Sequence, residues 1–440
     1  MPNLCMIPVL LKKDVTLLFN VHENDRSTSI LPLKKQEYIR DQFLVKRLDS
    51  VLREAMMKAE IPMWIVISKE YNEDPVVETL TPSEHESSRR LSIFVFVINP
   101  ENQQIERYVI GSPHPALQNL YTFIWDRQHE SQWQRLKKLV EEKQPSKIGI
   151  NRSKHIAVAD GLTSSMYDVL TEELGTSWVN RFVSAEHLVI HWFLKRSKEE
   201  MHIYPFLADL TSNLAKKALS NEVIYPGITT TTEVVDWLRQ KVYDLGIKTS
   251  FYPTVDIQRQ HATSDRLTHT IIMPGDIVHL DFGIEYLGLC TDTQQLSYVL
   301  KRGESKPPAG LQAAFRQALV FEDIVMRNMT IGKSGNQVFE ISMSEAKQSE
   351  INAMLYTHPI GRHCHEAGPI IGLFDQQTKI PFKGELVIVS DSAYALEFNI
   401  NTYIPEWGHE VYLYLEQPIA VYEDGSTYLT PRQECFYLVR

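Results

Sequence analysis

Two aspartates lie inside strand-like sequence in the stretch HLDFGIEYLGLCTDTQQ, residues 279–295. Asp281 ends the run DIVHLD and Asp292 ends the run YLGLCTD, and both runs are typical of covered β-strands. A buried carboxylate is costly unless it is paired, hydrogen-bonded or bound to a cation. The sequence therefore predicts a positively charged partner close to both aspartates.

Further acids and histidines stand in apolar surroundings later in the chain. Glu397 lies in AYALEFN, Glu416 lies in VYLYLEQ, and residues 357–369 read THPIGRHCHEAGP. Each of these residues taken singly is more often structural than functional. Taken together, carboxylates and an imidazole form a ligand set suited to Mn²⁺, Co²⁺, Fe²⁺ or Zn²⁺. The set predicts a metal site in the second half of the chain.

The bulk properties exclude several classes of protein. A chain of 440 residues exceeds the size at which single cores stop growing, so two domains are expected. The net charge of −10 argues against a nucleic-acid partner. Four cysteines without a CxxC pair predict neither disulfides nor a zinc ribbon, and a reducing, cytoplasmic location fits them. No apolar run approaches about 18 residues, so neither a membrane span nor a signal peptide is expected. A remnant of a signal peptide stays open as an alternative for residues 1–30, which have no clear place in the fold.

The order of helical and strand patterns predicts the domain organisation. In the first half, one amphipathic helix over 36–60 alternates with strands at 63–68, 91–98 and 146–151, which predicts an open mixed or parallel sheet. A charged segment near residue 195 marks the domain boundary. Helices are then expected at about 198–220, 231–245, 308–328 and 335–349. The predicted parts are an N-terminal extension (1–30), an α/β domain (31–194) and a catalytic domain (195–440).

The motifs resemble those of the pita-bread metallopeptidases, a family that includes methionine aminopeptidase, aminopeptidase P and prolidase, with creatinase as a metal-free relative. The chain is most similar to bacterial Xaa-Pro peptidase-like proteins, and the resemblance spans roughly residues 30 to 440. Its motifs are DTQQLSYVLKRGE (292–304), HPIGRHCHEAGP (358–369), PEWG (405–408) and RQECFYLV (432–439). The resemblance implies an α/β (α+β) fold, with a creatinase-like N-terminal domain followed by a C-terminal pita-bread catalytic domain.

The same resemblance implies a set of metal ligands. The family's order of Asp, Asp, His, Glu, Glu, with the aspartates eleven residues apart, is filled here by Asp281, Asp292, His358, Glu397 and Glu416. Two divalent ions are implied, with Mn²⁺ first and Co²⁺, Fe²⁺ or Zn²⁺ as alternatives. Glu397 is implied to act as general base as well as ligand.

Other histidines are implied to contact substrate. His365 is expected to steady the substrate or the tetrahedral intermediate, while His363, two residues away on the same strand face, either shapes the pocket or is structural. For the family's upstream histidine, which binds substrate and assists catalysis, His261 is the first choice if the loop before Asp281 carries an insertion. His269 is the alternative, and His279 is interpreted as a strand neighbour.

The sequence departs from the family pattern at three places. Thr291 replaces the usual Ser before the second aspartate, EFN replaces EPG after the first glutamate, and Tyr414 replaces an Arg before the last glutamate. These changes alter the surroundings of the metal and the substrate contacts more than the ligands themselves.

The resemblance implies a peptidase that cleaves Xaa-Pro bonds in dipeptides or short peptides, with a metal-activated bridging hydroxide as the nucleophile. The N-terminal domain of such relatives contributes to dimers, so a homodimer is expected. Two alternatives stay open. One is a creatinase-like, metal-independent C–N hydrolase, and the other is a non-catalytic binding protein on the same fold.

Overall fold

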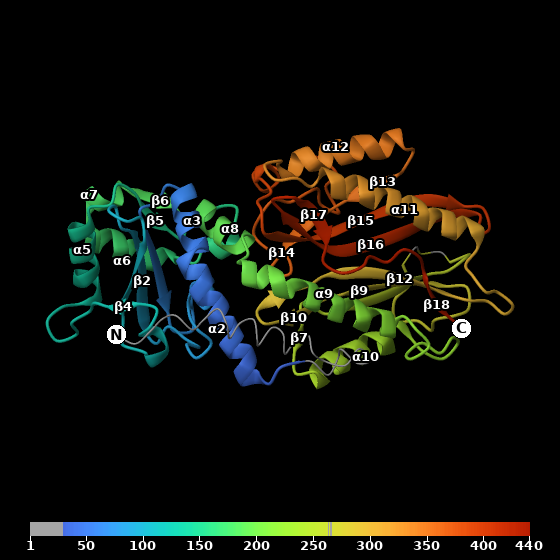
Figure 1. The fold of residues 1–440 in the computed structure, drawn as a ribbon, viewed down its shortest axis with the longest axis horizontal. Coiled ribbons are helices and arrows are strands. Elements are labelled where there is room, and N and C mark those ends of the chain that lie inside the picture. Colours follow the sequence, from blue (N-terminus) through green and yellow to red (C-terminus); the bar gives the residue numbers. More distant parts are fainter. Residues whose placement is uncertain (1–29, 263, 265) are drawn as a thin grey trace. The chain divides into compact units, whose positions relative to one another are not determined.

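The computed structural model describes residues 30–262, 264 and 266–440, which divide into two compact units (Figure 1). One unit is Leu33–Ser197, and the other contains Lys198–Arg440. The predicted extension over residues 1–30 lies, apart from Ile30, outside the described residues. Within the described part of the chain, no helix is long and apolar enough to cross a membrane.

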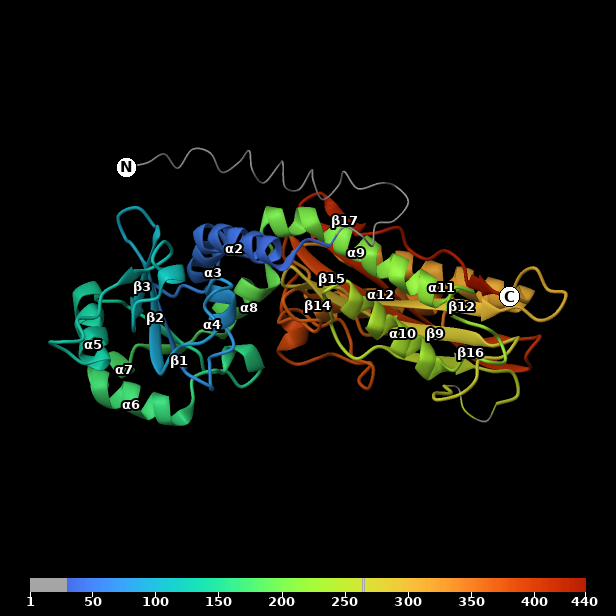
Figure 2. The same cartoon turned by 90° about the horizontal axis from the view of Figure 1, so that it is seen from below.

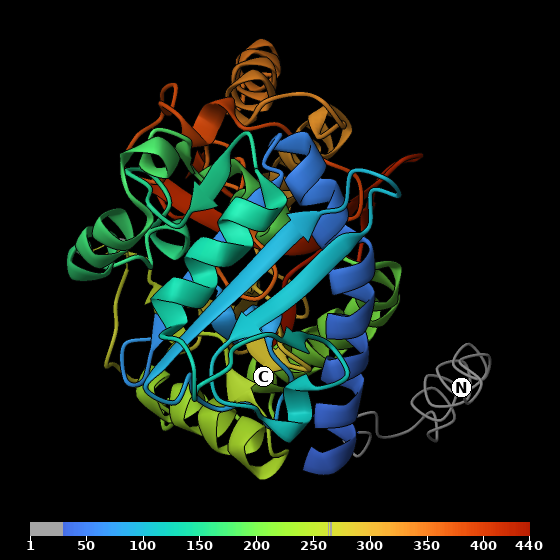
Figure 3. The same ribbon diagram turned by 90° about the vertical axis from the view of Figure 1, so that its left-hand side faces the viewer.

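The N-terminal unit is built on a six-stranded mixed sheet with the order β4-β3-β2-β1-β5-β6. Figure 3 shows strands of this unit flanked by helices. Its strands are β1 (Met63–Lys69), β2 (Leu91–Ile98), β3 (Ile105–Ile110), β4 (Thr122–Phe123), β5 (Ile148–Ile150) and β6 (Phe182–Ser184). β1 pairs antiparallel with β2 and parallel with β5, and its first six residues are all buried. A strand that is apolar on both faces must be covered on both sides. The three strands predicted in this half are confirmed.

Helices cover this sheet, and one of them differs from the prediction. The helices are α2 (Leu33–Asp49), α3 (Val51–Lys58), α4 (Val77–Leu80), α5 (Gln132–Lys143), α6 (Ser164–Leu174), α7 (Thr176–Val179) and α8 (Glu186–Leu194), with short 3-10 turns η2 (Pro115–Leu117) and η3 (Ala157–Ala159). The single helix predicted over 36–60 is wrong in one respect, because it is divided at Ser50, whose backbone (φ −118°, ψ −61°) departs from ideal helical values. The Ser50 hydroxyl donates to the carbonyl of Lys46 at 2.7 Å, a bond that competes with the helical ladder and bends helices.

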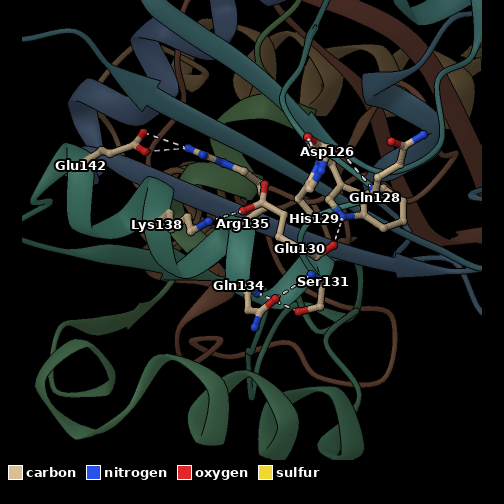
Figure 4. A network of polar contacts seen from close by, with 10 residues as sticks. Asp126, Gln128, His129, Glu130, Ser131, Gln134, Arg135, Lys138 and Glu142 are labelled. Carbon is tan, nitrogen blue, oxygen red and sulfur yellow. Dashed lines mark hydrogen bonds and ion pairs between the residues drawn. The ribbon is translucent and has the colours of Figure 1, made fainter.

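Local sequence fixes the start of α5, as Figure 4 shows. The Ser131 hydroxyl accepts from the backbone N–H of Gln134, and the Gln134 side chain accepts from the backbone N–H of Ser131. Such a capping box satisfies two N–H groups that would otherwise lack partners, and a cap of this kind is worth about 1 kcal/mol. The neighbouring ion pair between Lys138 and Glu130 involves an exposed lysine, so it contributes little.

The C-terminal unit contains a larger sheet, and the helices that accompany it are labelled α9 to α12 in Figures 1 and 2. The helices are α9 (Lys198–Ala218), α10 (Thr231–Asp244), α11 (Ala309–Asn328) and α12 (Gly335–Gln348), with the 3-10 turn η4 (Lys383–Glu385). The strands are β7 (Lys248–Thr249), β8 (Thr254–Gln258), β9 (Ile277–Phe282), β10 (Ile284–Tyr286), β11 (Leu289–Cys290), β12 (Thr293–Val299), β13 (Ala353–Leu355), β14 (His358–Ile360), β15 (Ser392–Ile404), β16 (His409–Tyr422), β17 (Gly425–Tyr428) and β18 (Tyr437–Val439). All four helices predicted here are confirmed.

The main sheet runs in the order β13-β15-β16-β12-β9-β8. β14, β17 and β18 pair with β15, β16 and β12 respectively, and β7, β10 and β11 form a separate small sheet. α9 packs on β9 and β12, α10 on β8, and α11 on β15 and β16, while α12 packs against α11. The helices therefore cover the main sheet along its whole width.

One face of the main sheet is apolar and packs on these helices. Leu280 on β9 is fully buried, and Phe398 on β15 meets Phe321 of α11 with ring centroids 5.2 Å apart. Because successive side chains point to opposite faces of a strand, Asp281 and Glu397 point away from the helices. Because the apolar face packs on the helices, the acids lie on the opposite face of the sheet.

Candidate metal centre

Four polar residues stand opposite one another across four neighbouring strands. Asp281 on β9 pairs with Gln294 on β12, Gln294 pairs with Glu416 on β16, and Glu416 pairs with Glu397 on β15. Residues that pair directly across strands point to the same face of a sheet. The register of the sheet therefore brings three of the predicted carboxylates side by side.

Two further predicted ligands complete the cluster. Asp292 immediately precedes β12, and His358 begins β14. His358 Nε2 lies 3.8 Å from an oxygen of Asp292, 3.6 Å from one of Glu397 and 3.7 Å from one of Glu416. Ligand atoms of Asp281, Asp292 and Glu416 also lie within 4.8 Å of one another. The structure thus gathers all five predicted ligands in one place.

Burial of these carboxylates makes their ionised forms costly. Asp292 and Glu416 are 4% and 1% exposed. Burial raises the pKa of Asp292, Glu397 and Glu416 well above ordinary values, and repulsion among the carboxylates raises it further. Burial also raises the pKa of Asp281 to about 6. Without a cation, the cluster holds protons that ordinary carboxyl groups release.

His358 is neutral and directs a lone pair at the acids. Burial, with a smaller contribution from His365, lowers the pKa of His358 to about 3. Its Nδ1 lies 3.2 Å from the carbonyl oxygen of Pro359, which assigns the ring proton to Nδ1. Nε2 then keeps its lone pair, which is the form of histidine that binds metal ions.

Several buried atoms of the cluster lack hydrogen-bond partners among the residues that the structure describes. They are Asp292 Oδ1, His358 Nε2 and both carboxylate oxygens of Glu416. Buried polar atoms are nearly always partnered, so this concentration of free lone pairs requires an explanation. Divalent cations fit it, because four carboxylates and one imidazole match the ligand preferences of Mn²⁺, Co²⁺, Fe²⁺ and Zn²⁺.

The histidines after His358 are placed differently from the prediction. His365 belongs to the cluster, since its ligand atom lies within 4.8 Å of those of Asp292 and His358, and its ring packs edge-on against His358 at 4.4 Å. His363 is exposed and lies beside Glu366, with its Nδ1 3.3 Å from the carboxylate. The shared strand face predicted for His363 and His365 is wrong, because β14 ends at Ile360 and the following residues form bends.

The upstream histidines lie apart from the ligand groups found in the described part of the chain. His261 is exposed and has a left-handed backbone (φ 66°), while His269 Nδ1 lies 3.1 Å from Thr232 Oγ1. His279, interpreted from sequence as a simple strand neighbour, is instead buried between two polar partners. Its Nδ1 lies 3.0 Å from Asp256, and its Nε2 lies 2.9 Å from Gln294.

Sequence reasoning missed two side chains that touch the cluster. Gln294 Nε2 donates to Glu397 at 2.5 Å, and the Cys364 thiol donates to Asp292 at 2.9 Å. Gln294 could have been recognised from the sequence, since it is a polar residue two positions after Asp292 in a strand that is buried throughout. The contact of Cys364 could not have been recognised from the sequence, because it depends on how the chain bends between β14 and β15.

The fold and the clustered residues together define an α/β protein with a pita-bread domain and a candidate metal centre. Residues 207–413 match the sequence profile of metallopeptidase family M24. This match to a metal-dependent family covers just under half of the chain, and it confirms the predicted resemblance to the pita-bread metallopeptidases. The matched segment holds four of the five clustered ligands, and Glu416 follows it closely. No curated protein matches the sequence significantly.

Solved structures share the fold over most of this chain at low sequence identity. An X-Pro aminopeptidase from Thermotoga maritima is 15% identical, with a TM-score of 0.62 over 88% of this chain and 100% of that one. An Xaa-Pro dipeptidase from Bacillus anthracis is 19% identical, with a TM-score of 0.58 over 91% and 99%. The N-terminal domain of a FACT complex subunit from chickpea (Cicer arietinum) is 11% identical, with a TM-score of 0.58 over 89% and 96%. These likenesses confirm the predicted fold class and its two parts.

Proposed function

We propose that this chain is a dinuclear-metal peptidase that hydrolyses Xaa-Pro bonds in dipeptides or short peptides. The observation that carries the proposal is the buried cluster of five ligands, several of whose lone pairs have no partners in the described part of the chain. Two of the similar structures are an X-Pro aminopeptidase and an Xaa-Pro dipeptidase, which supports the substrate class. Manganese is the first choice of metal, with cobalt, iron or zinc as alternatives.

The carboxylates of the cluster differ in their exposure to solvent, which indicates different roles. Glu416 is 1% exposed, so it is suited to holding an ion and not to meeting substrate. The Glu397 side chain is 17% exposed, and Asp281 is also partly exposed, so these two line the accessible side of the cluster. Divalent ions, when bound, polarise the scissile carbonyl and make a coordinated water more acidic.

Glu397 then acts as the general base, accepting the proton of the attacking water and passing it to the leaving nitrogen. His365, at the exposed edge of the cluster, donates to the oxygen on which negative charge develops. We retain His261 as the proposed upstream substrate contact, with His269 as the alternative, and His363 as a pocket or structural residue. A substrate with proline after the scissile bond lacks the amide N–H that most peptidase clefts bind, so a dedicated site is required.

Two alternatives remain distinct proposals. The chickpea protein is a subunit of the FACT complex, so the fold by itself is compatible with a binding protein. A creatinase-like hydrolase would act without metal. Neither alternative explains why the five clustered ligands lie together. Elemental analysis of the purified protein, which detects bound metal, distinguishes both alternatives from the metal-dependent enzyme.

We expect the metal-loaded protein to release the N-terminal residue from Ala-Pro or Ala-Pro-Gly at least about tenfold faster than from Ala-Ala or Ala-Ala-Gly, since proline specificity of this kind requires a dedicated site. The measurement is amino-acid release by chromatography, with chelator-treated protein as the control. Equal rates on both peptide pairs would exclude proline specificity. No release from any of the four peptides would exclude the proposed activity.

A further inference from the structure

A continuous line of hydrogen-bonded side chains leads away from Glu397. Gln294 Nε2 donates to Glu397 Oε1 at 2.5 Å, and Gln294 Oε1 lies 2.9 Å from His279 Nε2. His279 Nδ1 lies 3.0 Å from Asp256 Oδ2, and Arg266 Nε donates to the same oxygen at 3.0 Å. This line of side chains joins the cluster to the guanidinium group of Arg266, which is exposed to solvent.

The sheet itself builds this line. Asp256 on β8 pairs with His279 on β9, so the two side chains share a face. His279 stands two residues before Asp281, which places it on the face that carries the acids. Asp256, His279 and Gln294 are 1%, 2% and 5% exposed. Buried side chains that hydrogen-bond to one another hold each other in fixed positions.

The chemistry of the partners fixes the orientation of the Gln294 amide. An ionised carboxylate only accepts hydrogen bonds, so Gln294 must present its N–H group to Glu397. Its carbonyl oxygen then accepts from His279 Nε2. A flipped amide would set two acceptor oxygens against each other at Glu397. The far end is anchored as well, because the Arg266 guanidinium lies over the Tyr414 ring, 5.1 Å from its centroid.

We propose that Gln294 is a positioning residue that holds the Glu397 carboxylate ready to bind metal and to accept a proton, and that His279, Asp256 and Arg266 hold Gln294 in turn. The catalytic part of this inference rests on the proposed function, whereas the part that concerns metal binding does not. A carboxylate fixed by one N–H donor keeps its second oxygen free for an ion.

Gln295 provides a matched control for Gln294. It is the same residue type on the same strand, is 1% exposed and points to the opposite face, where it donates to Ser212 of α9. Methionine resembles glutamine in length and shape but has no N–H group. Gln294→Met and Gln295→Met therefore remove comparable buried amides, and only the first lies next to the cluster.

The experiment measures Mn²⁺ affinity by calorimetry, and kcat and KM on a short Xaa-Pro peptide, for both variants. We expect Gln294→Met to weaken Mn²⁺ binding at least about tenfold and to lower kcat by a similar factor at unchanged KM, as loss of a partner of a ligand typically does. Gln295→Met is expected to change each quantity by less than about twofold, because it lies on the far face of the strand. We also expect the double variant Gln294→Met/His279→Leu to have the same Mn²⁺ affinity and kcat as Gln294→Met. His279 acts through Gln294 in this proposal, so the effects of the two substitutions do not add.

Equal behaviour of the two methionine variants would overturn the inference, whatever the activity of the unaltered protein. If the unaltered protein hydrolysed no peptide, the proposed function would fail, and the Mn²⁺ affinities would still decide whether Gln294 positions Glu397. If Gln294→Met failed to fold, His279→Leu would take its place. Weaker Mn²⁺ binding by His279→Leu would support the line, and unchanged binding would overturn it.

Discussion

Glu397→Gln is expected to lower kcat on an Xaa-Pro peptide at least about 10³-fold, because under the proposed mechanism the variant loses its general base and a charged ligand together. Glutamine keeps the length of the side chain and its contact with Gln294. The variant should therefore fold normally while failing in chemistry. Initial rates of amino-acid release, compared with thermal unfolding of the same sample, check this expectation.

A suitable control is Glu410→Gln. Glu410 is an exposed glutamate on β16 whose carboxylate accepts from Asn401 at 2.8 Å. Because it is exposed and outside the cluster, its replacement should leave kcat within about twofold of the unaltered protein. Activity of Glu397→Gln within about tenfold of the unaltered protein would remove Glu397 from the proposed mechanism.

Metal-free protein is expected to lose stability as the pH rises above about 4. Asp281 has a folded-state pKa of about 6, and the pKa values of Asp292, Glu397 and Glu416 are raised further above ordinary values. Above about pH 4 these four carboxyl groups make the folded protein bind more protons than the unfolded chain. His358, whose folded-state pKa is about 3, offsets one of these protons up to its ordinary pKa of about 6.5. Four carboxyl groups outweigh one histidine, so stability falls until the folded groups have ionised. One pKa unit is worth about 1.4 kcal/mol, so a fall of several degrees in Tm is expected.

Added Mn²⁺ should reverse this loss, and it should raise Tm more at about pH 8 than at about pH 5 because binding requires deprotonated ligands. Asp292→Asn separates the cluster from other buried acids, such as Glu322, whose pKa burial raises to about 8. In that variant, the metal-free protein should be less sensitive to pH, and the effect of Mn²⁺ should nearly vanish. Thermal unfolding scans with and without chelator give both results, and a Tm indifferent to Mn²⁺ at every pH would contradict the metal site.

The sequence was sufficient for features that depend on local pattern and on the order of motifs. The helices α9 to α12 and the strands that carry Asp281 and Glu397 follow from periodicity. The five candidate ligands follow from the resemblance of the motifs to those of the family. Residues far apart in the chain could be grouped because each acid stands out in apolar surroundings.

Features that depend on strand register or on the path of a loop were not accessible. The contact of His279 with Asp256 and Gln294 exists because β8, β9 and β12 pair in one register, which no short stretch of sequence specifies. His363 and His365 have the spacing of strand neighbours, yet the chain bends after Ile360 and separates their environments. In each case, tertiary structure overrides the local pattern.

Anomalous diffraction from crystals soaked in Mn²⁺ tests the dinuclear site most directly. We expect two peaks, about 3.5–4 Å apart, enclosed by Asp281, Asp292, His358, Glu397 and Glu416. A map with a single peak in this cluster, or with none, would contradict the proposed dinuclear centre.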